Sequence, residues 1–140
     1  MANEIETYEN TELATSDTIE LDIPNGYICT VDRSTREGTI KVANALSDAE
    51  SLADMGTEKF ILTDVITTPG VRNRSGEPCT NTYLITDSDK ILMSQSDGIK
   101  RSAQQIVGLF NGDFGDGIEV AVIEKALRNG NTLKTLHFYC

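Results

Sequence analysis

Alternating apolar and polar residues predict strands along most of the chain after residue 58. Runs rich in β-branched and aromatic residues are separated there by short segments of Gly, Pro, Asn and Asp. The predicted strands are Phe60–Thr67, Thr80–Thr86, Lys90–Gln95, Ile118–Leu127 and Leu133–Tyr139. Turn signals at Asp87-Ser88-Asp89 and at Asn129-Gly130 predict that the second and third strands, and the last two strands, form hairpins.

Helical periodicity replaces this alternation between the third and fourth predicted strands. The apolar stripe consists of Ile99, Ala103, Ile106 and Phe110, and we expect it to face the core. Ser96 has the chemistry of an N-cap, and Asn111-Gly112 is a typical helix end. The sequence therefore predicts a helix over Asp97–Asn111.

The pattern before residue 59 predicts shorter elements. Thr18–Ile23 alternates and ends at the turn signal Pro24-Asn25-Gly26, which indicates a short strand with Tyr27–Val31 as a candidate return partner. Residues 1–17 have no periodic apolar pattern and carry five acids and no base, which is typical of a flexible acidic arm.

Two short helices are predicted between these elements and residue 59. Thr39–Leu46 places apolar residues on one side at helical spacing. Ser47-Asp48-Ala49-Glu50 has the form of a capping box, so a second helix is expected to begin there and to end at Gly56.

The order strand, strand, strand, helix, strand, strand from residue 59 resembles the chain order of a five-stranded OB barrel. The predicted fold class is mainly β (α+β), and a generic α+β sandwich is the competing fold. We expect a single domain over 18–140, in which 18–58 is a strand and helix extension and 59–140 is the barrel.

The net charge of −10 argues at first against nucleic acid, because binding to phosphates depends on Lys and Arg. The charge is distributed unevenly, however. Residues 1–58 carry 13 acids and 3 bases, whereas residues 59–140 carry 9 acids and 9 bases. The acidity therefore belongs to the first part of the chain, and the second part has to be judged separately.

Residues that perform catalysis or hold metals are scarce. His137 is the single histidine, the three cysteines are scattered, and there is no Cys-x-x-Cys pair. No nucleophile–base pair can be named, so we expect neither an enzyme nor a metal or cofactor site. No apolar run reaches the length of about 18 residues that crosses a membrane, and a reducing cytoplasm fits the cysteines.

Basic residues collect where an OB barrel binds oligonucleotides, in the loop joining strands one and two and the loop joining strands four and five. Arg72 and Arg74 fall in the first loop, and Arg128 falls in the second with Lys125 and Lys134 beside it. We interpret these loops as the walls of a groove for a single strand. The alternative is that they are ordinary solvated arginines and lysines.

Other candidates lie between the two loops. Lys90 is at the edge of the central hairpin, and Lys100 and Arg101 stand near the helix start, where a bound phosphate or the neighbouring Asp97 offsets their charge. Tyr83 is the candidate stacking platform, although a core position is a close alternative. The candidate nucleic-acid-binding residues are thus Arg72, Arg74, Tyr83, Lys90, Lys100, Arg101, Lys125, Arg128 and Lys134. Polar side chains at Ser94, Gln95 and Ser96 are expected to touch bases or sugars, with Met93 beside them.

Several segments also resemble a known family. They are Asn81-Thr82-Tyr83-Leu84-Ile85, Ser94-Gln95-Ser96-Asp97-Gly98-Ile99 and Asn129-Gly130-Asn131-Thr132-Leu133-Lys134-Thr135-Leu136, within a resemblance that covers roughly residues 20–139. The family is that of short single-stranded-DNA-binding proteins of phages and integrative elements of Firmicutes-like bacteria. The resemblance implies a cytoplasmic helper of replication and recombination that binds without strong sequence preference. It also implies an aromatic residue on the third strand, where this chain has Leu92 and Met93.

Three other functions remain open. An acidic protein-interaction or anti-defence module would use the first half to bind a basic host protein. A closed barrel would sequester a nucleotide, and a hydrolase is the most distant possibility. The acidic part is also a candidate contact for replication or recombination proteins, and the apolar last strand is an edge through which copies of the chain would pair.

Overall fold

The computed structural model describes residues 26–140. The predicted acidic arm and the predicted strand Thr18–Ile23 lie outside the described residues. The strands are β1 (Glu50–Ser51), β2 (Phe60–Val71), β3 (Pro78–Thr86), β4 (Ile91–Ser94), β5 (Ile118–Ala126) and β6 (Thr132–Phe138). The helices are α1 (Arg36–Asp48), α2 (Asp97–Phe110) and the short 3-10 helix η2 (Leu52–Met55). The five strands and the long helix predicted after residue 58 are confirmed to within a few residues of their ends.

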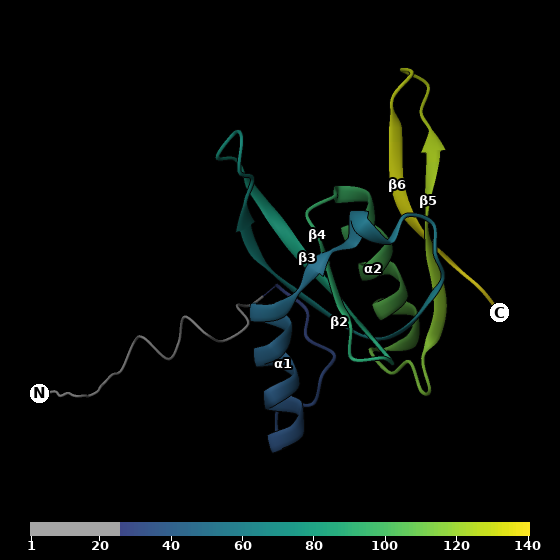
Figure 1. Cartoon of the computed structure of the whole chain (residues 1–140). Helices are drawn as coiled ribbons and strands as arrows, with labels where there is room; N and C mark the ends of the chain where they lie inside the picture. The colour runs from purple at the N-terminus through teal and green to yellow at the C-terminus, as the bar shows by residue number, and fades with distance from the viewer. Residues whose placement is uncertain (1–25) are drawn as a thin grey trace, which may run out of the picture.

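All six strands belong to one sheet, which curls into a half-barrel (Figure 1). The order is β1-β4-β3-β2-β5-β6, and every pair is antiparallel except β1 with β4. When β1 is left out, the spatial order β4-β3-β2-β5-β6 corresponds to the third, second, first, fourth and fifth strands of a five-stranded barrel. Along the chain, α2 lies between the third and the fourth of these strands. The predicted OB-like α+β fold is confirmed.

The curl of the sheet originates in β2, the longest strand. β5 pairs with β2 only over Phe60–Leu62, whereas β3 pairs with β2 from Leu62 onward, and the register shifts between Leu62 and Asp64. A bulge at such a point bends a strand and increases its twist. The two halves of the sheet therefore turn away from each other.

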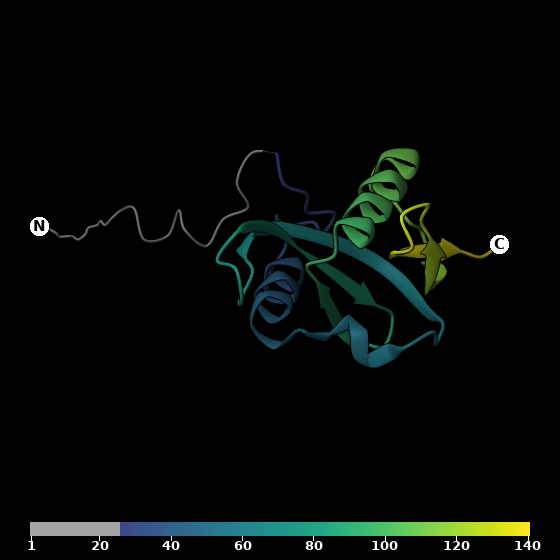
Figure 2. The ribbon, with the colours of Figure 1, turned by 90° about the horizontal axis from the view of Figure 1, so that it is seen from above.

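Alternation along the strands gives the sheet two apolar faces. The inner cluster fills the concave face beneath α2 and includes Leu62, Val65, Leu84, Leu92 and Val120 of the strands with Ile99, Ala103 and Ile106 of the helix. The outer cluster lies on the opposite face beneath α1 and consists of Val31, Val42, Ala45, Ile66, Tyr83, Ile85 and Ile91. Figure 2 shows α1 and α2 on opposite sides of β2.

The start of α1 follows from local hydrogen bonds. Thr35 is the N-cap, and its Oγ1 accepts from Gly38 N at 3.0 Å. Just before it, a carboxylate oxygen of Asp32 accepts from Ser34 N and Ser34 Oγ at 2.9 and 2.6 Å, and these bonds lower the pKa of Asp32. The helix predicted over Thr39–Leu46 is confirmed and is longer than expected.

Three expectations from the sequence are wrong in detail. Ser47 does not start a helix: it lies inside α1, where its Oγ donates to Ala43 O at 2.8 Å, and β1 and η2 follow before Gly56. The segment Tyr27–Val31 forms one bridge, between Cys29 and Ile66, instead of a strand. Phe110 is predicted to lie in the buried stripe of α2, but it is the last residue of the helix and is 47% exposed.

The start of α2 has the predicted cap. Ser96 Oγ accepts from Ile99 N at 3.4 Å, and Asn111 follows the last helical residue with a left-handed φ of 55°. The helix also lies against the outer edge of β6, where Ser102 Oγ accepts from Leu136 N at 3.1 Å. The last strand is predicted to be a free edge of the sheet, and α2 occupies part of that edge. Within residues 26–140, no helix is long and apolar enough to cross a membrane.

Candidate nucleic-acid interface

One end of the half-barrel carries most of the basic residues, and we call it the basic end. There β2, β4 and β5 finish and β3, α2 and β6 begin, which brings together residues 72–77, 97–101 and 124–134. These three segments hold seven Lys or Arg and three Asp or Glu. At the opposite end, residues 87–90 and 111–117 hold four Asp and one Lys. The fold thus converts a chain of net charge −10 into a molecule with one locally cationic end.

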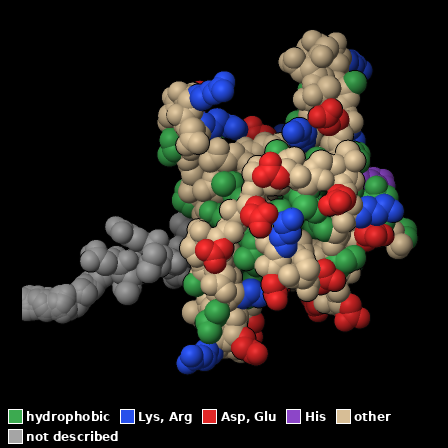
Figure 3. Space-filling model, in the orientation of Figure 1, with side chains coloured by type: hydrophobic (Ala, Val, Ile, Leu, Met, Phe, Trp, Pro, Cys, Tyr) green, Lys and Arg blue, Asp and Glu red, His purple; other side chains and the backbone are tan. Residues whose placement is uncertain are grey.

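Two loops project from the basic end on either side of a gap, and Lys and Arg side chains lie on both projections (Figure 3). In the β2–β3 loop, Gly76 N donates to Arg72 O at 2.9 Å, and Arg72 N donates to Glu77 O at 3.0 Å. These bonds close the loop on itself and leave Arg74 exposed within it. Gly76 permits the closure because its φ is 71°.

The β5–β6 loop is equally well defined. Leu127 N donates to Asn131 O at 2.8 Å, and Asn131 N donates to Asn129 Oδ1 at 3.0 Å. Gly130 supplies the left-handed position with a φ of 86°, as the predicted Asn129-Gly130 hairpin signal requires. Arg128 is exposed in this loop. The structure therefore brings Arg72, Arg74 and Arg128 to the same end but to opposite sides of the gap.

The N-terminal turns of α2 lie between the two loops. Gly98 allows this, because a Cβ at that position would collide with Lys134 O. Lys100 is half-buried and Arg101 is exposed in the first two turns. Asp97 pairs with Arg72, with 3.6 Å between Oδ1 and Nη2, so one loop arginine is tied to the start of the helix.

Lys125 and Lys134 lie on opposite strands of the β5–β6 hairpin, and both are exposed. In the register, Lys125 is opposite Leu133 and Lys134 is opposite Glu124. Adjacent positions on a strand face opposite sides, so Lys125 and Glu124 do not share a face. Lys134 therefore has a carboxylate directly across from it, whereas Lys125 has an apolar neighbour.

Lys90 lies at the edge of the central hairpin, as predicted, but it does not belong to the basic end. Lys90 lies in the β3–β4 turn, at the end of the half-barrel opposite the two loops. Its Nζ is 3.8 Å from Glu50 Oε1, and both side chains are largely exposed. β3 begins at the basic end and runs away from it, so the turn between β3 and β4 that contains Lys90 lies at the opposite end.

Tyr83 is not available as an exposed stacking platform. It is 8% exposed and belongs to the outer cluster, covered by α1. Alternation along the strand places Tyr83 and Ile85 on the same face of the sheet. This face is buried beneath α1, just as the opposite face is buried beneath α2. The basic end contains no Phe, Tyr or Trp, since none occurs in residues 72–77, 97–101 or 124–134.

Among residues 26–140 the sheet does not close on itself. A cleft of about 500 Å³ lies in the seam between β4 with β1 on one side and β5 with β6 on the other. Ser94, Ser96 and Lys134 line this seam cleft, as do Leu52 and Glu124. The two serines and Lys134 are among the residues predicted from the sequence. Leu52 and Glu124 are not, because their proximity depends on long-range pairing that no local pattern signals.

Metal-ligating residue types are scattered through the part of the chain that the structure describes. Within residues 26–140, no three His, Cys, Asp or Glu side chains are grouped as a metal site requires. His137 contacts Tyr139 edge-on, with 4.7 Å between ring centroids, and Lys59 Nζ lies 4.3 Å from the centre of the Tyr139 ring. His137 is thus an exposed residue in contact with the Tyr139 ring.

Comparison with known proteins identifies a family. The family model described as phage single-stranded DNA-binding protein matches residues 22–139, which is most of the chain. No curated protein and no solved structure matches. The matched family is one of DNA-binding proteins, and its match includes α1, the whole half-barrel and both basic loops. The chain therefore belongs to the phage single-stranded-DNA-binding protein family.

Proposed function

We propose that this protein coats single-stranded DNA with little sequence preference and supports DNA replication and recombination of a phage or mobile element. The observation that carries the proposal is the basic end, where two loops and the start of α2 gather seven Lys or Arg around a gap. Family membership supports single-stranded DNA as the ligand. We place this activity in the cytoplasm of the bacterial host.

The phosphate contacts are proposed for residues of the basic end alone. They are Arg72, Arg74, Lys100, Arg101, Lys125 and Arg128, and Lys134 is proposed to contact the bound strand from the mouth of the seam cleft. Contacts between cations and phosphates release counterions and do not read base sequence. Because the basic end lacks Phe, Tyr and Trp, stacking adds little there, and we expect unusually strong salt dependence for a protein of this class.

A titration of labelled oligothymidine, followed by fluorescence anisotropy at two salt concentrations, tests the proposal. We expect Arg74→Ala combined with Arg128→Ala to weaken binding at least tenfold at low salt. The slope of log K against log salt should fall by about 0.7 for each phosphate that the variant no longer neutralises. The matched control is Lys90→Ala, which removes a cation from the opposite end and should leave the slope unchanged.

Two results would count against the proposal. The first is an absence of oligothymidine binding even at low salt. The second is an equal loss of affinity in the double variant and in Lys90→Ala, which would mean that overall charge matters and the basic end does not.

The acidic first part of the chain is proposed as a contact for replication or recombination proteins. Residues 1–25 carry seven acids and no base, so they repel DNA and attract basic protein surfaces. Deleting residues 1–17 should leave oligothymidine affinity equal or higher while weakening any such protein contact. A loss of DNA affinity on deletion would contradict this assignment.

A further inference from the structure

The seam cleft exists because the pairing of β1 stops early. β1 pairs with β4 only at Glu50–Leu92 and Ser51–Met93, so within residues 26–140 no strand pairs with this edge of the sheet at Ser94. On the far side of the seam, β6 is the other end of the sheet. The resulting volume of about 500 Å³ is within the range of pockets that hold small ligands, roughly 300–1,000 Å³.

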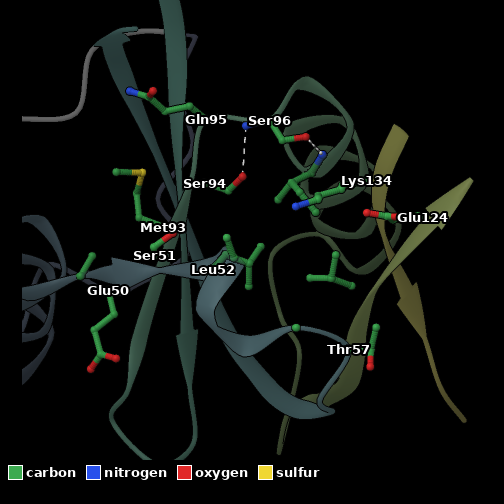
Figure 4. Close-up of a pocket in the computed structure, with 15 residues that line it drawn as sticks. Glu50, Ser51, Leu52, Thr57, Met93, Ser94, Gln95, Ser96, Glu124 and Lys134 are labelled. Atoms are coloured by element: carbon green, nitrogen blue, oxygen red, sulfur yellow. Dashed lines mark hydrogen bonds between the residues drawn. The ribbon is translucent and has the colours of Figure 1, made fainter. Parts of the chain in front are cut away.

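Figure 4 shows how the side chains of the cleft are directed. Ser94 from β4 and Leu52 from η2 point into the space, and Lys134 and Glu124 reach into it from β6 and β5. Met93, Gln95 and Glu50 also border the cleft but point away from it. Over an apolar base, the side chains directed into the cleft thus offer one ammonium, one carboxylate and the hydroxyl of Ser94, and the hydroxyls of Ser51, Thr57 and Ser96 also line it.

The apolar part is rigid and belongs to the core. Leu52, Ile99 and Val122 are 4%, 1% and 7% exposed, and all three pack in the inner cluster. A flat ring that enters the cleft would meet this surface without a rearrangement of the sheet. Apolar walls with a few directed polar groups are the usual composition of a small-molecule site.

The cleft also opens at the basic end. Ser96 directly precedes α2, and Lys134 belongs to the same hairpin as Arg128. A strand whose phosphates contact both basic loops therefore passes over the mouth of the cleft. Glu124 makes the interior unsuited to a phosphate, because a carboxylate repels that group.

We propose that, within a strand whose phosphate contacts do not read sequence, the seam cleft holds one unstacked base and that this single position prefers guanine and accepts thymine least. This inference rests on the proposed function, since it names a subsite of the same DNA path. Single-stranded nucleic acids are commonly read through bases that are splayed out of the stack and hydrogen-bonded on their edges.

The preference for guanine follows from the positions of Glu124 and Lys134, which lie opposite each other in the β5–β6 register and both line the cleft. Guanine presents two adjacent N–H donors, N1–H and the 2-amino group, which match the two oxygens of a carboxylate, and its O6 accepts from an ammonium. Thymine presents a single N–H between two carbonyl oxygens, so a carboxylate that accepts from it is repelled by the flanking oxygens. Cytosine and adenine each have one amino group and should rank between the two.

The test uses the full chain and oligothymidines of equal length that carry one central guanine, inosine or thymine. Anisotropy competition should show about three- to tenfold tighter binding for the guanine oligonucleotide than for plain oligothymidine. Inosine lacks the 2-amino group, so it should bind with intermediate affinity. The ratio of affinities is the readout, because it is insensitive to changes in overall charge.

Two variants complete the test. Glu124→Gln keeps the shape of the side chain and should reduce the guanine preference to less than twofold. Asp116→Asn removes a carboxylate from the α2–β5 turn, outside the cleft, and should leave the preference intact. Thermal unfolding of both variants checks that each remains folded.

The outcomes separate this inference from the proposed function. Equal affinity for the three oligonucleotides, or a preference that survives Glu124→Gln, overturns the guanine subsite while leaving single-strand binding in place. No binding to any of them at low salt overturns both. A guanine preference that Glu124→Gln abolishes and Asp116→Asn preserves supports the subsite.

Discussion

The two apolar clusters on the faces of the sheet differ in size and in what covers them. The inner cluster contains thirteen buried residues that come from every strand except β1 and from η2, α2 and the α2–β5 turn. The outer cluster contains seven, and its cover is α1 with the segment before it. The inner cluster therefore joins all the long strands to α2, whereas the outer cluster attaches α1 to the other face of the sheet.

This difference bears directly on DNA binding. An OB barrel receives oligonucleotides on the face of its second and third strands, which here are β3 and β4. In this protein α1 covers the side chains of that face, including Tyr83 and Ile91. The DNA path that we propose then consists of the two basic loops and the seam cleft, and it contains cations and hydrogen-bonding groups instead of aromatic rings.

The largest effect is expected from truncation in the inner cluster. Leu84 has no exposed surface, so Leu84→Ala should lower the free energy of unfolding by about 2–5 kcal/mol, through reduced burial and the cavity left behind. Urea unfolding followed by circular dichroism measures this. Val71→Ala, at a position that is 59% exposed, is the control and should change stability little. Similar losses in the two variants would refute a rigid inner core.

A smaller effect is expected from the equivalent change in the outer cluster. Val42 of α1 is 7% exposed, and Val42→Ala should cost about 1–2 kcal/mol of unfolding free energy. Affinity for oligothymidine should stay the same, since α1 lies away from the proposed DNA path. If Val42→Ala were as destabilising as Leu84→Ala, the two clusters would form one cooperative core, and the comparison between them would fail.

Replacement of Tyr83 distinguishes burial from stacking. Tyr83→Leu keeps an apolar side chain of comparable volume, so the free energy of unfolding should fall by less than about 1.5 kcal/mol. A base stacked on an aromatic ring contributes about 1–3 kcal/mol to binding, and we expect the variant to keep its full affinity. Oligothymidine titration is the measurement. A tenfold weaker affinity with intact folding would mean that α1 moves away when DNA binds.

The smallest effect concerns the ion pair that ties α1 to β2. Lys41 Nζ lies 3.2 Å from Asp64 Oδ2, and the two side chains are 39% and 17% exposed. Because the pair is partly solvated, Lys41→Gln should cost only about 0.2–1 kcal/mol of unfolding free energy. The loss should shrink in 1 M salt, where the Debye length is about 3 Å. A loss that is independent of salt would indicate packing by the lysine stem instead.

The sequence by itself determined the order of elements and the distribution of charge. The strands after residue 58, the Ser96 cap of α2 and the Asn129-Gly130 hairpin follow from local periodicity and turn chemistry, which act over a few residues. The bases in the two loops were also predictable, because strand order alone brings those loops to one end of a barrel.

Only the tertiary structure decided which faces and edges are covered. Alternation separates the two faces of β3 but does not say that a helix buries the face of Tyr83. A capping box at Ser47 is a local preference of about 1 kcal/mol, and it yields to the continuation of α1 and to the pairing of β1 with β4. That same pairing stops at Met93 and leaves the seam cleft. Contacts between residues distant in the chain set these features, and no local pattern encodes them.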